Sequence, residues 1–290
     1  MVGQLQYIAV EYPLFAATGA LYAAAMALYA AAWKSTRKAI AQAGTAVMLA
    51  ALVMNAAVFV LRWHEAGRAP LKSLFESLVF FALCIAIVYV FFEMIYKTRA
   101  FGVPATLLAL GCLVYALMKW DAEIVKLPPA LQSPWFVPHV MVYFVGYAAV
   151  AIAFALAVIQ LLAPRVKVVG RLLTMQAGTI MTGKPLDIEK MSYDLVRFGF
   201  VLLTVGLLVG SVWAKSAWGD FWVWDPKENW SLVTWLVYGG YLHLRRVRGW
   251  RGEKGAWLLI VGFAVVMFTY LGMHLLPTAE ESAHVYSGQG

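Results

Sequence analysis

Long apolar runs separated by short polar connections dominate the pattern of this chain. Each run is about 18 to 25 residues long, which is the length that a helix needs to cross a bilayer. Eight runs are expected to be spans: residues 10–33, 39–61, 74–96, 100–118, 139–163, 198–214, 226–244 and 255–276. The pattern therefore predicts an all-α, polytopic membrane protein that forms one domain over residues 1–290.

The composition supports a membrane protein. Hydrophobic residues make up 63% of the chain and charged residues only 13%, and a soluble domain of this length would then expose large apolar patches. The first run has no basic leading region and no A-x-A site, so we do not expect a cleaved signal peptide.

Successive connections between the runs lie on alternate sides of the membrane, and basic residues are concentrated in the connections of one side. Most of the 23 Lys and Arg residues lie in residues 34–38, 97–99, 165–197 and 245–254. The positive-inside rule places this set in the cytoplasm, with residues 164–197 as a cytoplasmic loop and both termini outside. The net charge of +8 is thus a signal of topology, and nucleic-acid binding is not expected.

One connection is unusually rich in tryptophan, and we call residues 215–230 the Trp-rich segment. Five of the twelve tryptophans lie in or just after it: Trp218, Trp222, Trp224, Trp230 and Trp235. A tryptophan belt at the membrane surface is the alternative interpretation. A belt usually needs one or two indoles per helix end, so five favour an external platform for a large planar ligand such as an iron macrocycle.

Helix caps explain some polar residues near this segment. Asp225-Pro226-Lys227-Glu228 is typical of an N-cap, a first-turn proline and a capping box. Ser73 and Glu76 predict a second capping box. Asp225 stays among the candidate ligand-binding residues because it ends the Trp-rich segment, although capping alone would explain it.

The predicted orientation sorts the five histidines. His64, His139, His274 and His284 fall at or beyond the outer helix ends, whereas His243 lies at the inner end of the seventh run. Trp235, Gly239 and His243 share one helix face, and Gly239 could leave room beside the imidazole.

Other polar or reactive residues are expected to be structural. Cys84 and Cys112 lack any metal-ligand spacing and are expected to pack in the core. Asn55 and Glu93 lie in or near spans, where polar residues tend to face the bundle interior. Glu93 is also close enough to the inner end to reach the membrane interface, so no role is assigned to it.

Several stretches resemble one family. The run WGDFWVWDPKENW resembles the WWD signature of haem-handling proteins of cytochrome c maturation. Its DPKE core and the later LHLR resemble the CcsA (ResC) family of the system II machinery. LRWHEAGRAPLKSLFESLVFF, PWFVPHVMVYFVGYA and FTYLG…AHVYS also resemble that family, in family order, and together these matches cover about half of the chain.

The resemblance implies a function in the cell membrane. Proteins of this family are thought to carry haem b across the membrane and to present or attach it to the C-x-x-C-H motif of apocytochrome c. The expected partners are a CcsB (ResB) type membrane protein, apocytochrome c and a thioredoxin-like thiol reductant. The chain would then be the haem-binding component of a holocytochrome c synthase complex, with no catalytic residue assigned.

The resemblance also implies the haem ligands. His139 and His284 would be the outer axial ligands, and His243 would bind haem within the membrane. His274, near an outer helix end, is the alternative to His284. The tryptophans and Asp225 would line the haem. Independently of the resemblance, four cations that are predicted on the outer side are candidates for binding its propionates: Lys215, Lys227, Arg62 and Arg68.

Two other function classes remain open at this point. The chain could be a haem exporter or chaperone without ligation activity. It could also be an unrelated multi-pass transporter whose tryptophans only anchor it in the membrane.

Overall fold

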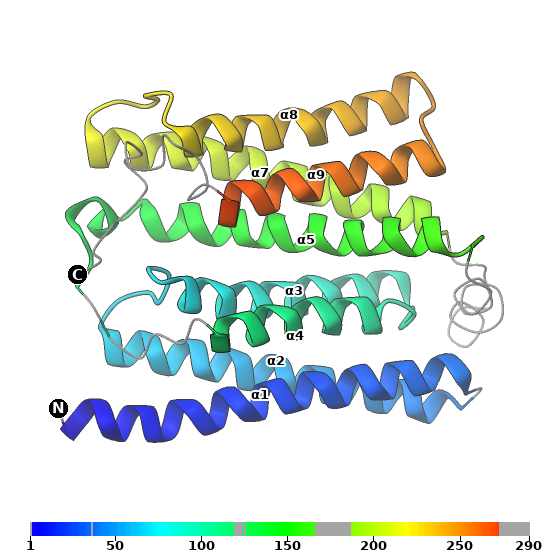
Figure 1. Ribbon diagram of the computed structural model, residues 1–290, viewed down its shortest axis with the longest axis horizontal. Helices are drawn as coiled ribbons and strands as arrows, with labels where there is room; N and C mark the ends of the chain where they lie inside the picture. The colour runs from blue at the N-terminus through cyan, green and yellow to red at the C-terminus, as the bar shows by residue number, and fades with distance from the viewer. Residues whose placement is uncertain (1, 36, 119–123, 125, 166–186, 273–290) are drawn as a thin grey trace. The chain divides into compact units, whose positions relative to one another are not determined.

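The computed structural model describes residues 2–35, 37–118, 124, 126–165 and 187–272. These residues form eight long α-helices and one short 3-10 helix, without a strand (Figure 1). The elements are α1 (Val2–Lys34), α2 (Lys38–Ala66), α3 (Leu74–Tyr96), α4 (Gly102–Met118), η1 (Pro129–Gln132), α5 (Phe136–Leu162), α7 (Ile188–Trp218), α8 (Pro226–Val247) and α9 (Glu253–Leu271). Each long helix covers most or all of one expected apolar run, so the all-α class is confirmed.

Six of the described helices are long and apolar enough to cross a membrane, namely α1, α2, α3, α5, α7 and α9. Helix α4 is apolar but shorter, with 17 residues. Helix α8 carries charged residues at both ends, Lys227 and Glu228 at its start and Arg245 and Arg246 at its end. The chain is a multi-pass membrane protein.

Helix α7 begins at Ile188, ahead of residue 198 where the apolar run starts. Its first turn is stabilised by Glu189. That carboxylate accepts hydrogen bonds from Arg245 Nη1 at 2.8 Å and from the backbone N–H of Gly252 at 3.2 Å. These contacts join the start of α7 to the end of α8 and to the N-cap of α9. Residues 188–197, expected in a loop, are therefore helical, and residues 166–186 of that loop lie outside the described residues.

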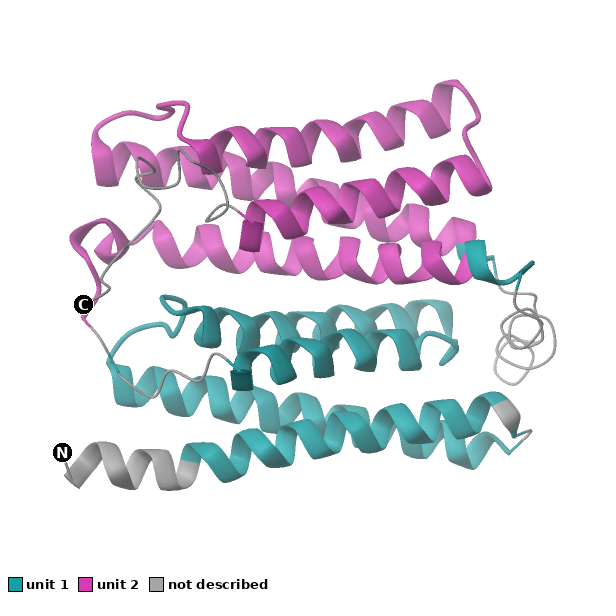
Figure 2. Cartoon of the chain, in the orientation of Figure 1, with its two compact units in different colours: residues 1–125, 161–188 teal, residues 126–160, 189–290 magenta. Residues whose placement is uncertain are grey.

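The chain divides into two compact units, where the sequence suggested one domain (Figure 2). Unit 1 comprises residues 1–125 and 161–188 and contains α1 to α4. Helix α1 packs against α2 and α4, and α3 packs against the same two helices. Unit 1 is therefore a four-helix bundle.

Unit 2 comprises residues 126–160 and 189–290 and is a second bundle. Helices α5 and α7 approach closely where Gly146 faces Gly199. A Cβ on Gly199 would lie only 3.2 Å from the carbonyl oxygen of Gly146. Aromatic pairs join the other neighbours. Phe200 stacks on Trp235 between α7 and α8, Trp230 contacts Phe268 between α8 and α9, and Phe154 stacks on Phe263 between α5 and α9.

Polar side chains inside unit 1 face one another, as expected for residues in or near spans. Asn55 is fully buried and contacts the Tyr22 hydroxyl at 3.1 Å. Glu93 accepts hydrogen bonds from Tyr29 at 3.0 Å, from Thr45 at 2.6 Å and from Arg99 at 3.1 Å. The expectation that Asn55 faces the interior is confirmed, and Glu93, for which the sequence left the interface open, is also buried. Cys84 is also buried in the core, as predicted, whereas Cys112, for which the same was expected, is only half-buried.

Candidate functional site

The cap of α8 shapes the Trp-rich segment. Asp225 is the N-cap, and its carboxylate accepts a hydrogen bond from the backbone N–H of Lys227 at 2.8 Å. Glu228 accepts from the backbone N–H groups of Val223 and Asp225, at 2.9 and 3.1 Å. Asn229 donates to the carbonyl of Trp224 at 2.8 Å. The predicted capping box is confirmed, and it also holds the two residues on either side of Trp224, whose indole is exposed.

Trp224 has an unusual backbone conformation. Its φ angle is +59°, a left-handed conformation that bulky residues rarely adopt. The bonds from Asn229 and to Glu228 hold the chain on both sides of it. The Trp224 side chain is 68% exposed, and its ring meets Trp222 edge to face with centroids 5.9 Å apart. The segment thus presents an indole to its surroundings at a conformational cost.

The five tryptophans do not form one continuous surface. Trp230 packs on Phe268 of α9, with ring centroids 4.4 Å apart. Trp235 stacks on Phe200 of α7 and donates its indole N–H to Thr204 at 2.9 Å. Both rings therefore stabilise helix packing in unit 2. Trp222 and Trp224 lie in the connection that leads into α8, and Trp218 is the last residue of α7.

His139 sits in the first turn of α5 against α7. Its ring lies nearly parallel to that of Trp213, at 20° with centroids 5.5 Å apart. Its Nδ1 atom lies 2.9 Å from the carbonyl oxygen of Gly206. Trp213 also contacts Trp218, with centroids 4.8 Å apart. The imidazole is therefore connected to the Trp-rich segment through the buried ring of Trp213.

Trp213 was not among the residues singled out from the sequence. It lies outside the dense tryptophan cluster, on α7, and it is only 3% exposed. Its indole N–H donates to the carbonyl of Ala130 in η1 at 2.9 Å. A signal was present in the sequence, because Gly206, Gly210 and Trp213 follow helical spacing and share one face of α7.

The other histidines are placed differently. His243 is exposed near the end of α8. Phe200 borders Gly239, since a Cβ there would lie 3.4 Å from that ring, at ordinary van der Waals distance, whereas nothing lies within 4 Å of a Cβ on Gly240. His64 is exposed in the last turn of α2, and His274 and His284 lie outside the described residues.

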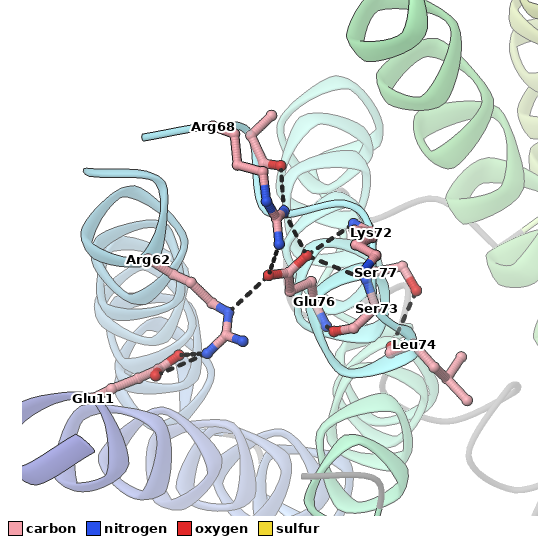
Figure 3. A network of polar contacts seen from close by, with 9 residues as sticks. Glu11, Arg62, Arg68, Lys72, Ser73, Leu74, Glu76 and Ser77 are labelled. Carbon is pink, nitrogen blue, oxygen red and sulfur yellow. Dashed lines mark hydrogen bonds and ion pairs between the residues drawn. The ribbon is translucent and has the colours of Figure 1, made fainter. Parts of the chain in front are cut away.

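Two of the four proposed propionate partners are already bound to carboxylates in unit 1 (Figure 3). Arg62 pairs with Glu11 at 3.0 Å and with Glu76 at 3.1 Å. Arg68 pairs with Glu76 at 3.1 Å. Glu76 also accepts from the backbone N–H of Ser73 and forms the predicted capping box. Because removing one member would leave a buried charge unpaired, these arginines have a structural role.

The two remaining cations lie at the two ends of the connection between α7 and α8. Lys215, in the last turn of α7, places its ammonium 5.6 Å from the ring centroid of Phe221 and donates to the carbonyl of Gly219. Lys227 is the second residue of α8. Among the described residues, no group of three or more His, Cys, Asp or Glu side chains could hold a metal ion.

Comparison with known proteins identifies the family. The sequence profile of the family described as Cytochrome C assembly protein matches residues 71–279, which is more than half of the chain. The chain belongs to the cytochrome c assembly protein family.

Relatives in this family are similar over most of their length. The chain is 36% identical over 261 residues to the cytochrome c biogenesis protein CcsA of Parasynechococcus marenigrum (strain WH8102), covering 81% of this chain and 85% of the relative. It is 34% identical over 284 residues to CcsA of Synechococcus elongatus, covering 82% and 86%. CcsA of Chlamydomonas reinhardtii is 37% identical over 240 residues, covering 79% and 64%. The resemblance to the CcsA family is confirmed.

A solved structure shares the fold of this cytochrome c assembly protein. It is named Cytochrome c Heme Lyase CcmF, and it matches with a TM-score of 0.64 at 16% identity. The match covers 91% of this chain and 47% of CcmF, so the chain spans about half of that protein's length. At this identity the likeness concerns the fold alone.

Proposed function

We propose that this protein moves haem b to the outer side of the cell membrane and presents it to the C-x-x-C-H motif of apocytochrome c. It does so together with a CcsB/ResB-type membrane partner. Membership of the cytochrome c assembly family supports the general role. One observation carries the site: the half-buried imidazole of His139 stacks on Trp213, which contacts Trp218 at the edge of the Trp-rich segment.

The outer haem would be held by two imidazoles and by indole rings. His139 and His284 coordinate the iron from opposite faces, with His274 as the alternative to His284. Trp218, Trp222 and Trp224 cover the porphyrin. Burial of the apolar macrocycle contributes about 25 cal/mol per Å² before the cost of association. The propionates would lie towards Lys215 and Lys227, because Arg62 and Arg68 are bound to carboxylates.

His243 would contact haem before it reaches the outer site. It is exposed on α8, at the opposite end of that helix from Asp225. A neutral imidazole in this position can serve as one axial ligand. The second ligand would come from the partner, which explains why one chain alone would be incomplete.

The attachment reaction needs orientation more than acid–base chemistry. Each cysteine thiol adds across a haem vinyl group, so that an S–C bond forms on one vinyl carbon and the thiol proton ends on the other. The thiols must be reduced first, which is the task of a thioredoxin-like reductant. This chain would contribute proximity and orientation, and the histidine of C-x-x-C-H would replace one of its own axial ligands.

The test is the absorption spectrum of the purified protein with its haem. We expect a Soret band that His139→Ala and His284→Ala shift or abolish, because each removes an axial ligand. His64→Ala is the matched control, since His64 is exposed at the end of α2 in unit 1. A preparation without a Soret band, or one unchanged by both ligand variants, would contradict the proposed site.

A second experiment separates ligation from export. Covalent cytochrome c is measured in cells that contain this chain with and without a CcsB-type partner. Formation of the thioether product only when both are present supports a joint synthase. If haem reaches the outer side but no product forms with both, the chain would be an exporter or chaperone.

A further inference from the structure

The face of α7 that contacts the His139 imidazole carries glycines, so no side chain occupies the space in which the ring lies. Gly206 and Gly210 are separated by one helical turn and share this face. A Cβ on Gly206 would lie 2.7 Å from the Tyr143 ring, and one on Gly210 would lie 2.5 Å from Cε1 of His139 and 2.7 Å from its Nδ1. Real Cβ atoms do not come this close to a ring, so the imidazole occupies space that only glycine leaves.

The two glycines act together on one hydrogen bond. His139 Nδ1 lies 2.9 Å from the carbonyl oxygen of Gly206. In an α-helix the side chain of residue i+4 lies over the carbonyl of residue i, because Cβ bonds tilt towards the N-terminus. A side chain at position 210 would therefore cover the oxygen that His139 contacts. Gly210 keeps the carbonyl of Gly206 accessible from α5.

This hydrogen bond fixes the tautomer of the imidazole. A carbonyl oxygen can only accept, so Nδ1 must carry the proton and donate it. A neutral imidazole protonated on Nδ1 has its lone pair on Nε2. Histidines that bind metals commonly donate their other ring N–H to a carbonyl or carboxylate, which orients the ring and increases its basicity.

The plane of the ring is fixed separately. Trp213 lies at 20° to the imidazole, and its own indole N–H is bound to the carbonyl of Ala130. The edge of His139 also meets the ring of Tyr143, with centroids 5.0 Å apart at 76°. Rotation of the imidazole about its own axis would break the contacts on both sides.

We propose that Gly206, Gly210 and Trp213 are positioning residues for haem ligation, and that they present Nε2 of His139 to the iron. The proposal rests on the proposed function, because it assumes that His139 is an axial ligand. It adds which nitrogen binds, which helix orients it, and why glycine is required at position 210.

The test compares two glycine substitutions in the purified haem protein, with its partner present. Gly210→Ala should displace the imidazole, so the six-coordinate low-spin spectrum is lost and the reduction potential of the haem rises. Added imidazole should restore the low-spin spectrum, as it should for His139→Gly. Gly111→Ala is the control, because nothing lies within 4 Å of a Cβ at that helical position in α4, and its spectrum and potential should equal those of the wild type.

The outcomes distinguish this inference from the function on which it rests. If His139→Gly keeps the wild-type spectrum, His139 is not the ligand and the proposed site fails. If His139→Gly loses the low-spin spectrum but Gly210→Ala keeps both spectrum and potential, the positioning role is overturned and the function stands. If Gly210→Ala loses the low-spin spectrum and added imidazole does not restore it, the substitution has damaged the fold in general, and the positioning role is also overturned.

If Gly210→Ala does not fold, His139 can be replaced by Nε2-methylhistidine. This analogue blocks Nε2 with a methyl group and, in the neutral ring, leaves Nδ1 without a proton, so the donated bond to Gly206 is lost as well. Loss of the low-spin spectrum is expected, and a retained low-spin spectrum would show that Nε2 is not the coordinating nitrogen.

Discussion

The carboxylate of Glu228 lies 2.9 Å from the backbone nitrogen of Val223, five residues earlier in the chain. The same oxygen accepts the backbone N–H of Asp225 at 3.1 Å. One side-chain atom therefore holds both residues that flank Trp224. The exposed indole depends on this contact because the left-handed backbone of Trp224 is unfavourable without it.

Two substitutions of Glu228 distinguish the effect of its hydrogen bonds from the effect of its negative charge. Glu228→Ala should lower the free energy of unfolding by about 1–2 kcal/mol through the lost cap, and it should also reduce haem retention. Glu228→Gln keeps an oxygen that can accept both bonds, so it should stay near the wild type. Thermal unfolding and the Soret absorbance in detergent measure the two effects. If both variants lose the same stability, the negative charge matters and the hydrogen bonds do not.

Truncation of two tryptophans should affect different properties, the stability of the fold for Trp235 and haem binding for Trp224. Trp235 stacks on Phe200 and donates to Thr204, so Trp235→Ala should cost about 3–5 kcal/mol of stability. Trp224 is 68% exposed, so Trp224→Ala should leave the stability of the haem-free protein within about 0.5 kcal/mol and weaken haem binding. Unfolding of the haem-free protein and haem titration distinguish the two. Equal loss of stability would mean that Trp224 is also a packing residue.

The buried ion pairs of unit 1 should be sensitive to removal of one partner. Arg62→Met leaves Glu11 and Glu76 without their shared cation and should cost about 3–5 kcal/mol. Lys190→Ala breaks an exposed pair with Asp194, in which Lys190 is 61% exposed, and should cost under about 1 kcal/mol. Thermal unfolding in the same detergent compares them. A wild-type midpoint for Arg62→Met would contradict the assigned role of the network.

The orientation of the chain can be tested with single cysteines. Phe221 and Arg251 are exposed in connections at opposite ends of α8. In a background without Cys84 and Cys112, Phe221→Cys should react with a membrane-impermeant maleimide on intact spheroplasts. Arg251→Cys should react only after lysis, as the positive-inside rule predicts. The reverse labelling pattern would place the Trp-rich segment in the cytoplasm and exclude an external haem site.

Local sequence signals predicted the helices well. Apolar runs gave eight helices, and both capping boxes, Ser73 with Glu76 and Asp225 with Glu228, form as expected. These features depend on residues within a few positions of one another. The early start of α7 depends on Glu189 reaching Arg245, and no local pattern specifies a partner that far along the chain. The division into two units depends on long-range contacts for the same reason.

The candidate site was predictable only in part. Tryptophan density located the segment but could not say which rings pack between helices, and Trp230 and Trp235 do so. Position 139 stood out through its histidine, whereas its neighbours on α7 did not, since glycines and a buried Trp213 are also common in ordinary helix packing. Only the placement of α5 against α7 joins these residues.

The polarity of α8 has a consequence for synthesis. Its charged ends make it a weak stop signal when it emerges from the ribosome, whereas α9 is apolar enough to span the membrane. Two hydrogen bonds join α8 to α9. The hydroxyl groups of Thr234 and Thr269 lie 3.0 Å apart, and the Thr269 hydroxyl donates to the carbonyl of Trp230 at 3.2 Å. We therefore expect α8 to enter the membrane as a hairpin with α9. The aromatic turn that precedes α8 would then be set in place only once α9 has been translated.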